Sequence, residues 1–139
     1  MIQRIQTLYL FIVIVLQSVL LYTGIAKYAG TAGEDTVIKT IAIPLLAALA
    51  SFTAIIPAIS LFLYKKRMLQ MRFNIFNSIL LVALQGFIVY YIVSNTGQET
   101  KFIFTIQSVF PVISLILSIM AIRKILRDEI LIQSLNRIR

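Results

Sequence analysis

Lys65-Lys66-Arg67-Met68-Leu69-Gln70-Met71-Arg72 divides the chain into two halves, each of which carries two long apolar runs. Four of these eight residues are cationic, and the runs on either side contain no charged residue. A short basic segment between two uncharged runs is typical of a loop that joins two membrane helices on one side of a bilayer. The segment therefore predicts a membrane protein that turns at this point.

Four uncharged runs are long enough to cross a membrane as helices. At about 1.5 Å of rise per residue, about twenty residues cross a hydrocarbon core roughly 30 Å thick. We expect a single all-α domain over residues 1–139, built as a four-helix bundle of two transmembrane hairpins, with a helical cytoplasmic tail over residues 123–139. The expected spans cover residues 5–26, 40–64, 73–94 and 102–122.

The composition also favours lipid over water as the solvent. Hydrophobic residues make up 60% of the chain and charged residues 13%, whereas a soluble domain carries about 25% charged residues. A chain of 139 residues has too small a core to bury so much apolar surface. The net charge of +8 lies at the ends of the apolar runs rather than on a separate basic face, which argues against nucleic acid binding.

Basic residues are distributed unevenly between the two predicted sides of the membrane. Of the 13 Lys and Arg residues, all but Lys27, Lys39 and Lys101 fall on the side of the termini and the central basic segment. The positive-inside rule therefore predicts that both termini and this segment are cytoplasmic. The cytoplasmic basic residues next to the apolar runs are expected to contact anionic lipid headgroups. These residues are Lys65, Lys66, Arg67, Arg72, Arg123 and Lys124.

Matching landmarks in the two halves favour an internal repeat. Gln17 and Gln85 each lie 13 residues after an arginine. In the second run of each half, Pro57-Ala58-Ile59-Ser60-Leu61 resembles Pro111-Val112-Ile113-Ser114-Leu115, so Pro111 is expected inside the fourth span as Pro57 is inside the second. Two explanations stay open at this point, a duplicated hairpin and chance matches between apolar segments.

Polar side chains within the apolar runs predict contacts between helices. An amide in hydrocarbon needs a hydrogen-bond partner, which a neighbouring helix supplies when small residues allow close approach. The alternative interpretation is that Gln17 and Gln85 line a binding cavity. We expect inter-helix polar contacts from Gln17, Asn74, Ser78, Gln85 and Gln107. Packing within the bundle and a homo-oligomer are both compatible with the small residues of the second run, Ala47, Ser51, Ala54 and Ala58.

The chain offers no residue set for catalysis or for holding a cofactor or a metal. It has no cysteine and no histidine, which excludes thiolate sites and removes the commonest general base. The four apolar runs contain no ionisable Asp, Glu, Lys or Arg, whereas ion-coupled carriers place such a group within the membrane. We therefore expect a protein that is not an enzyme and uses no cofactor.

The C-terminal tail is the strongest candidate for binding a partner. Residues 123–139 contain strong helix formers and neither Gly nor Pro, so the fourth helix is expected to continue into the tail. The two interpretations of the tail are a helix that docks on a protein partner and a helix that lies on anionic headgroups. The candidate contact residues are Arg127, Asp128, Glu129, Ser134, Arg137 and Arg139.

Both ends of the chain resemble a known family. The opening Met-Ile-Gln-Arg-Ile-Gln-Thr-Leu-Tyr-Leu resembles the start of an uncharacterised family of four-span membrane proteins from Bacteroidota, a domain of unknown function. The pattern Arg127-Asp128-Glu129-x-Leu131-x-x-Ser134-x-x-Arg137-x-Arg139 resembles the ending of that family. The resemblance implies a multi-pass protein of the inner membrane of a Gram-negative bacterium, and it implies no activity.

Two functions fit these observations. The first is a non-enzymatic scaffold or accessory subunit of a membrane complex, which binds a protein through its tail. The second is a small carrier or binder that holds an apolar or neutral ligand within the helix bundle. The lipid bilayer is the other partner expected in both cases.

Overall fold

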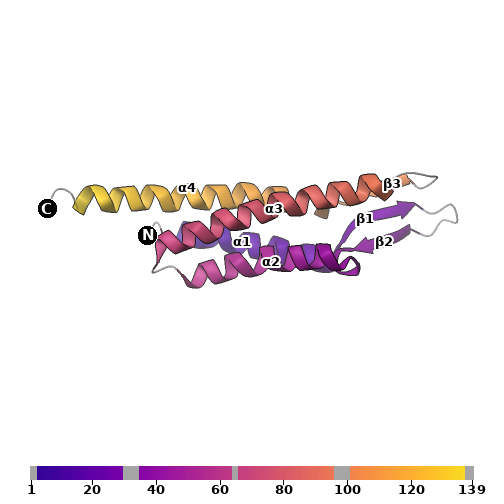
Figure 1. Ribbon diagram of the computed structural model, residues 1–139, viewed down its shortest axis with the longest axis horizontal. Coiled ribbons are helices and arrows are strands. Elements are labelled where there is room, and N and C mark those ends of the chain that lie inside the picture. Colours follow the sequence, from indigo (N-terminus) through magenta and orange to yellow (C-terminus); the bar gives the residue numbers. More distant parts are fainter. Residues whose placement is uncertain (1–2, 30–34, 64–65, 96–100, 137–139) are drawn as a thin grey trace.

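Four long helices dominate the computed structural model, which describes residues 3–29, 35–63, 66–95 and 101–136 (Figure 1). Each helix is long and apolar enough to cross a membrane. The predicted all-α membrane fold with four spanning helices is therefore confirmed. The helices are α1 (Gln3–Tyr22), α2 (Pro44–Phe62), α3 (Arg67–Asn95) and α4 (Phe110–Asn136).

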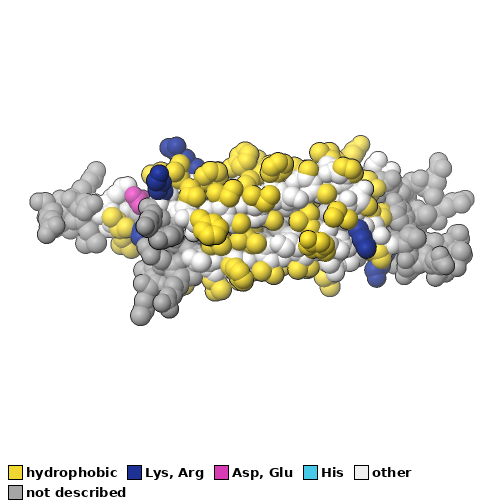
Figure 2. Space-filling model, turned by 90° about the horizontal axis from the view of Figure 1, so that it is seen from below, with side chains coloured by type: hydrophobic (Ala, Val, Ile, Leu, Met, Phe, Trp, Pro, Cys, Tyr) yellow, Lys and Arg dark blue, Asp and Glu magenta, His cyan; other side chains and the backbone are white. Residues whose placement is uncertain are grey.

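The helices pack as two hairpins that lie side by side. α1 packs against α2 and α4, and α3 packs against the same two helices, so α1 and α3 occupy opposite corners of the assembly, here called the helical body. Large apolar side chains are exposed on the outside of every helix, among them Phe11, Phe52, Ile79 and Ile116. The face in Figure 2 accordingly shows apolar side chains between two ends that carry Lys and Arg. This surface suits contact with hydrocarbon.

A three-stranded antiparallel sheet lies at one end of the helical body, where the sequence predicted only a loop and the ends of two spans. The central strand β1 pairs with both edge strands, and Ala26 lies opposite Ile38 on one side and Phe104 on the other. The expected helix over residues 5–26 therefore ends at Tyr22, and the expected span over residues 102–122 begins as a strand. The strands are β1 (Gly24–Ala29), β2 (Asp35–Lys39) and β3 (Lys101–Phe104).

The sheet belongs outside the hydrocarbon because its edge strands, β2 and β3, pair with no further strand in the part of the chain that the structure describes. Hydrocarbon offers no partner for the free N–H and C=O groups of an edge strand, so open sheets do not lie in the core of a bilayer. The β-branched residues Val37 and Ile38 explain why β2 is extended rather than an irregular loop. At Gly24 the strands approach so closely that an added Cβ would lie 2.1 Å from Cγ1 of Val37.

Short 3-10 helices connect the sheet to α2 and α4. η1 (Thr40–Ala42) leads to Pro44, the first residue of α2, and η2 (Ile106–Val109) leads to Pro111, the second residue of α4. Proline is tolerated in a first helical turn because its missing N–H has no helical partner there. Pro111 thus lies inside the fourth candidate span, Ile106–Ser134, as expected, but in the first turn of α4 rather than in the middle of a helix as Pro57 does. Among the residues described, only Pro57 lies inside a helix away from its first turn.

Both termini of the described chain lie at the end opposite the sheet (Figure 1). We call this the basic end, because it carries Lys66, Arg67 and Arg72 together with the cations of α4 from Arg123 onwards. The opposite end is called the sheet end. The predicted basic loop is mostly helical, because α3 already begins at Arg67. The predicted helical tail is confirmed, because α4 runs without a break to Asn136 and projects beyond the other helices.

Candidate functional site

Gln17 connects three helices in the interior of the helical body. It is fully buried on α1, and its Nε2 donates a hydrogen bond of 2.9 Å to Oγ of Ser114 on α4. Its Oε1 accepts a hydrogen bond of 3.2 Å from Oγ1 of Thr53 on α2. Because a buried amide is costly without partners, these bonds fix the register of α1, α2 and α4.

Two further amides lie one turn apart in the interior, on α3. Asn74 and Asn77 are fully buried, and neither the oxygen nor the nitrogen of either amide has a partner among the described residues. The buried hydroxyl of Ser118 on α4 also lacks a partner there. On α2, Pro57 has no N–H, so the carbonyl of Thr53 loses its usual helical donor. Within the described residues, the interior thus contains unpaired polar side chains on α3 and α4, beside an α2 carbonyl without its usual helical donor.

The remaining amides and hydroxyl predicted to bridge helices are placed differently. Ser78 donates to the carbonyl of Asn74 in its own helix over 2.9 Å, so this bond does not cross between helices. Gln85 is half-buried on α3, and its Oε1 has no partner among the described residues. Gln107 lies in η2, the 3-10 helix that precedes α4 at the sheet end, and its Oε1 is also unpaired within the described part of the chain.

Side-chain hydroxyls fasten the sheet end to the helical body. The hydroxyl of Thr40 donates to the carbonyl of Leu20 over 2.6 Å, and its backbone N–H donates to the carbonyl of Thr23 over 3.2 Å. These donors satisfy carbonyls that the C-terminus of α1 leaves free. On the other side of β1, the hydroxyl of Ser108 donates to the carbonyl of Ile25.

At the basic end, a hydrogen bond joins the beginning of α1 to the C-terminal half of α4, two turns before the projecting end of that helix. Nε2 of Gln6, which is almost fully buried, donates to Oδ2 of Asp128 over 2.5 Å. Asp128 was predicted to contact a partner, but in this structure its carboxylate is engaged within the chain. Sequence spacing gives no indication of this pair, because 122 residues separate the two positions.

The other candidate tail residues lie on two faces of α4. Arg127 and Ser134 are exposed, and the hydroxyl of Ser134 donates to the carbonyl of Leu131 in its own helix over 2.8 Å. Glu129 lies on the side of α3 and accepts a hydrogen bond of 3.5 Å from Gln133. Arg137 and Arg139 lie outside the described residues.

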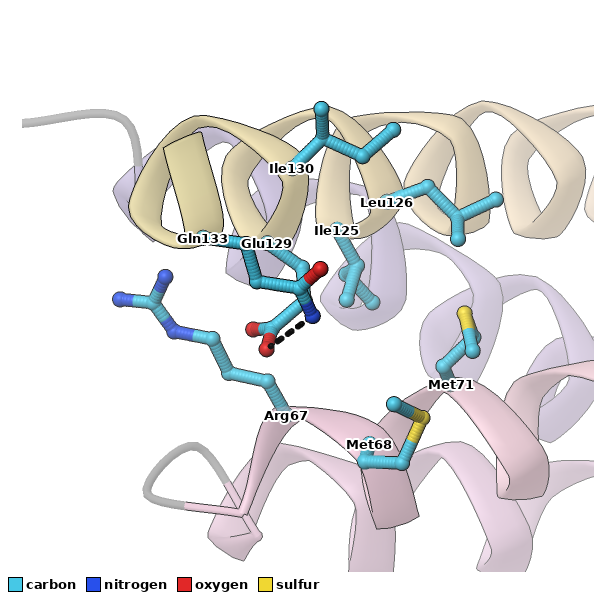
Figure 3. Close-up of a pocket in the computed structure, with 8 residues that line it drawn as sticks. All are labelled: Arg67, Met68, Met71, Ile125, Leu126, Glu129, Ile130 and Gln133. Atoms are coloured by element: carbon cyan, nitrogen blue, oxygen red, sulfur yellow. Dashed lines mark hydrogen bonds between the residues drawn. The ribbon is translucent and has the colours of Figure 1, made fainter. Parts of the chain in front are cut away.

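A cleft opens between α3 and α4 at the basic end. Arg67, Met68 and Met71 line it from α3 (Figure 3). The residues that line it from α4 are Ile125, Leu126, Glu129, Ile130 and Gln133. Its volume is about 200 Å³. The cleft therefore combines apolar walls with a charged and polar mouth.

The other cations predicted to contact headgroups also lie at the basic end. Lys66, Arg72 and Arg123 are exposed, whereas Lys124 and Arg67 are half-buried. Lys65 lies outside the described residues. A second hollow, on α3, is lined by Arg72 together with Leu69, Phe73 and Phe76.

A sequence profile described as “Domain of unknown function (DUF4293)” matches residues 2–138. The chain belongs to the DUF4293 family. The match covers nearly the whole chain, which confirms the expected membership of a family of unknown function. No similar curated protein and no similar solved structure was found.

Several polar residues of this DUF4293 protein were not predicted from its sequence. Asn77 follows Asn74 by three residues, a spacing that places both on one helical face. The sequence therefore did indicate that Asn77 faces the interior together with Asn74. Thr53 sits among small residues on α2 and gave no comparable signal. Gln6 lies near the helical face of Gln17, which indicated that it points inward but did not identify its partner.

Proposed function

We propose that this DUF4293 protein is a non-enzymatic accessory subunit of a membrane complex, which binds a protein partner through the projecting end of α4. The observation that carries the proposal is an exposed apolar group beyond a charged segment of the same helix. Ile130, Leu131 and Ile132 are 64%, 51% and 41% exposed. They follow the charged segment that runs from Arg123 to Glu129.

The length of α4 supports a position of this apolar group outside the hydrocarbon. The helix has 27 residues, which at 1.5 Å per residue give about 40 Å, against roughly 30 Å for the hydrocarbon core. Since α4 begins beside the sheet, the excess length lies at the basic end. Exposed apolar side chains in an aqueous or headgroup region favour a contact with another molecule.

The direction of α4 favours a protein as the partner of its end, rather than the headgroups of the membrane surface. A helix that lies on headgroups must turn away from the axis of the spanning helix. α4 continues straight from Phe110 to Asn136 in Figure 1, with no glycine and no proline after Pro111 that favours a bend. Its end is therefore directed away from the bilayer rather than along it.

One face of the α4 end is exposed and lies outside the lining of the cleft. Arg127, Leu131 and Ser134 follow each other at spacings of four and three residues, which places them on one side of the helix. All three are exposed, and none lines the cleft with α3. We propose this face as the contact with the partner.

The location that we propose is the inner membrane of a Gram-negative bacterium of the Bacteroidota, with the basic end in the cytoplasm. The resemblance at both ends of the sequence supports the bacterial group. The positive-inside rule supports the orientation, because Lys66, Arg67, Arg72 and the cations of α4 all lie at one end of the helical body.

Co-purification of the full-length chain from its native membrane tests the partner. We compare the wild type with Leu131→Ser and with the control Ile116→Ser, which removes a similarly exposed side chain (55%) from the apolar part of the same helix. We expect one protein to accompany the wild type and the control, identified by mass spectrometry and cross-linked near residue 131, and to be lost with Leu131→Ser. The same set of proteins with all three chains, or none with the wild type, would sink the proposal.

A second candidate function, the binding of a small neutral polar ligand in the interior, is supported by the unpaired groups of Asn74, Asn77 and Ser118. If these groups hold no ligand, Asn77→Leu removes an unpaired amide and leaves the melting temperature unchanged or raised. If these groups hold a ligand, Asn77→Leu lowers the melting temperature, and Asn77→Gln, which keeps the amide, lowers the melting temperature less. The melting curves of the purified variants in detergent distinguish the two.

A further inference from the structure

We propose that the cleft between α3 and α4 at the basic end binds one anionic phospholipid, with an acyl chain between the two helices and the phosphate beside Lys66 and Arg67. Of the exposed apolar group on α4, Ile130 lines this cleft and Ile132 lines a hollow beside it, so the lipid site is separate only from the partner face of Arg127, Leu131 and Ser134. The partner face carries Leu131, whereas the cleft lies on the opposite side of α4, around Glu129 and Gln133.

The inner part of the cleft is apolar and suits a hydrocarbon chain. Met68 and Met71 approach from α3, and Ile125 and Leu126 line the side of α4 (Figure 3). The volume of about 200 Å³ exceeds the roughly 150 Å³ of an apolar cavity that accepts benzene. Methionine side chains are flexible and adjust to ligands of irregular shape.

The mouth of the cleft carries the cations. Arg67 is the first residue of α3, one turn outside Met71, and in Figure 3 its guanidinium is directed away from the two methionines. An adjoining hollow of about 480 Å³ is lined by Lys66, Arg67 and the carboxylate-bearing Glu129, together with Met68, Leu69 and Ile132. Two neighbouring cations thus lie where the apolar walls end.

The nearby carboxylates accept hydrogen bonds from amides, and neither forms an ion pair with these cations among the residues that the structure describes. Asp128 accepts a hydrogen bond from Gln6, and Glu129 accepts one from Gln133. Arg67 lines the same cleft as Glu129, yet no ion pair joins them in the described part of the chain. The charges of Lys66 and Arg67 therefore remain available for a phosphate, with which Arg and Lys form strong charge-assisted hydrogen bonds.

The order of these groups along the helices matches the order of groups in a phospholipid. Apolar walls lie toward the middle of the helical body and cations lie at its end, as an acyl chain lies below a phosphate in a leaflet. Basic pockets between transmembrane helices are known to hold anionic headgroups. A water-soluble anion fits less well, because it leaves the walls at Met71 and Leu126 in contact with water.

The test uses the purified full-length protein in a neutral detergent. Phosphatidylglycerol and phosphatidylcholine with identical acyl chains are titrated in, while the melting temperature is followed and native mass spectrometry counts retained lipids. We expect phosphatidylglycerol to give the larger rise and one retained molecule. Glycerol phosphate, which offers the phosphate without chains, is expected to give no rise.

Matched variants separate a built site from general surface charge. Arg67→Gln is expected to weaken phosphatidylglycerol binding about fivefold, since each cation near an anionic surface contributes about 1 kcal/mol. Arg123→Gln also removes one positive charge from the basic end. This exposed residue lines neither the cleft nor the adjoining hollow, so we expect little change in phosphatidylglycerol binding. Met71→Trp fills the cleft without altering charge and is expected to weaken retention of the lipid. Each variant must melt as the wild type does without lipid.

Three results would overturn the proposal. Equal stabilisation by the two lipids would remove the role of the phosphate. Equal losses with Arg67→Gln and Arg123→Gln would leave only attraction to a basic surface. Unchanged retention with Met71→Trp, or a rise with glycerol phosphate as large as that with the lipid, would remove the role of the acyl chain.

Discussion

Gln6 and Asp128, which stand 122 residues apart in the chain, are joined by a 2.5 Å hydrogen bond between the amide nitrogen of the first and a carboxylate oxygen of the second. This bond connects the beginning of α1 to α4 at the basic end. Hydrogen bonds to a charged partner contribute about 1.5–3 kcal/mol. The pair therefore stabilises the contact between the first and the last helix.

We expect Asp128→Ala to lower the free energy of unfolding by about 1.5–3 kcal/mol, because it removes the partner of the nearly buried Gln6 amide. Thermal unfolding in detergent, followed by circular dichroism, measures the change. Glu129→Ala is the control: its bond to Gln133 is long and exposed, so the expected loss is about 0.5 kcal/mol or less. Additive effects of Gln6→Ala and Asp128→Ala in a double-mutant cycle would contradict the contact.

Gln17 and Gln85 occupy matching positions in the sequence but different surroundings in the structure. Gln17→Leu breaks two bonds that cross between helices, and we expect a loss of about 1–2 kcal/mol. Gln85→Leu removes an amide whose Oε1 has no partner, and we expect no loss or a small gain. The same unfolding assay measures both variants. A similar loss for the two would show that Gln85 has a partner in the membrane.

The two glycines of the described chain, Gly24 and Gly86, give opposite expectations for alanine. In Gly24→Ala the new Cβ meets Cγ1 of Val37 at 2.1 Å and the carbonyl oxygen of Ile38 at 3.2 Å, so we expect a loss of about 1–3 kcal/mol. Gly86→Ala meets no atom within 4 Å and is expected to gain up to about 1 kcal/mol, because alanine favours helix. Adding Val37→Ala to Gly24→Ala is expected to restore part of the loss; no restoration would argue against this clash.

The absence of cysteine from the chain makes the proposed orientation easy to test. Ser134→Cys places a single thiol at the end of α4, and Lys27→Cys places one on β1 at the sheet end; both positions are exposed. In cells stripped of their outer membrane, a membrane-impermeant maleimide is expected to label the cysteine at position 27. The cysteine at position 134 is expected to react only after the inner membrane is opened. The reverse pattern would invert the topology.

The four spanning helices were predictable because each corresponds to a long run without charges. The helical continuation into the tail was also predictable, since residues 123–136 contain good helix formers and no breaker. The exact ends of the helices were not predictable. Residues 24–26 continue the first apolar run in sequence, yet they form a strand because β2 and β3 pair with them.

The sheet could not be predicted because its pairing is not local. β1 pairs with β3, which lies more than seventy residues further along the chain, and its few residues show no strong alternation. The prolines illustrate the same difficulty. Pro111 was matched to Pro57 by its neighbours in sequence, whereas its position after a 3-10 helix corresponds to that of Pro44.

The polar interior was predictable only in part. An amide in an apolar run indicated that Gln17 faces other helices, but its partners Ser114 and Thr53 depend on the relative register of helices that are distant in sequence. The cleft at the basic end depends on how α3 and α4 pack, so no local pattern predicted it.

The strand β1 and the Gln6–Asp128 pair have a joint consequence for how the two hairpins stay together. β1 belongs to the first half of the chain and pairs with β3 of the second at the sheet end. The Gln6–Asp128 pair connects the same two halves at the basic end. Contacts at both ends of the helical body thus hold the two halves together, in addition to the covalent connection between α2 and α3. Two separately synthesised halves would therefore have contacts that favour their reassembly at either end of the helical body.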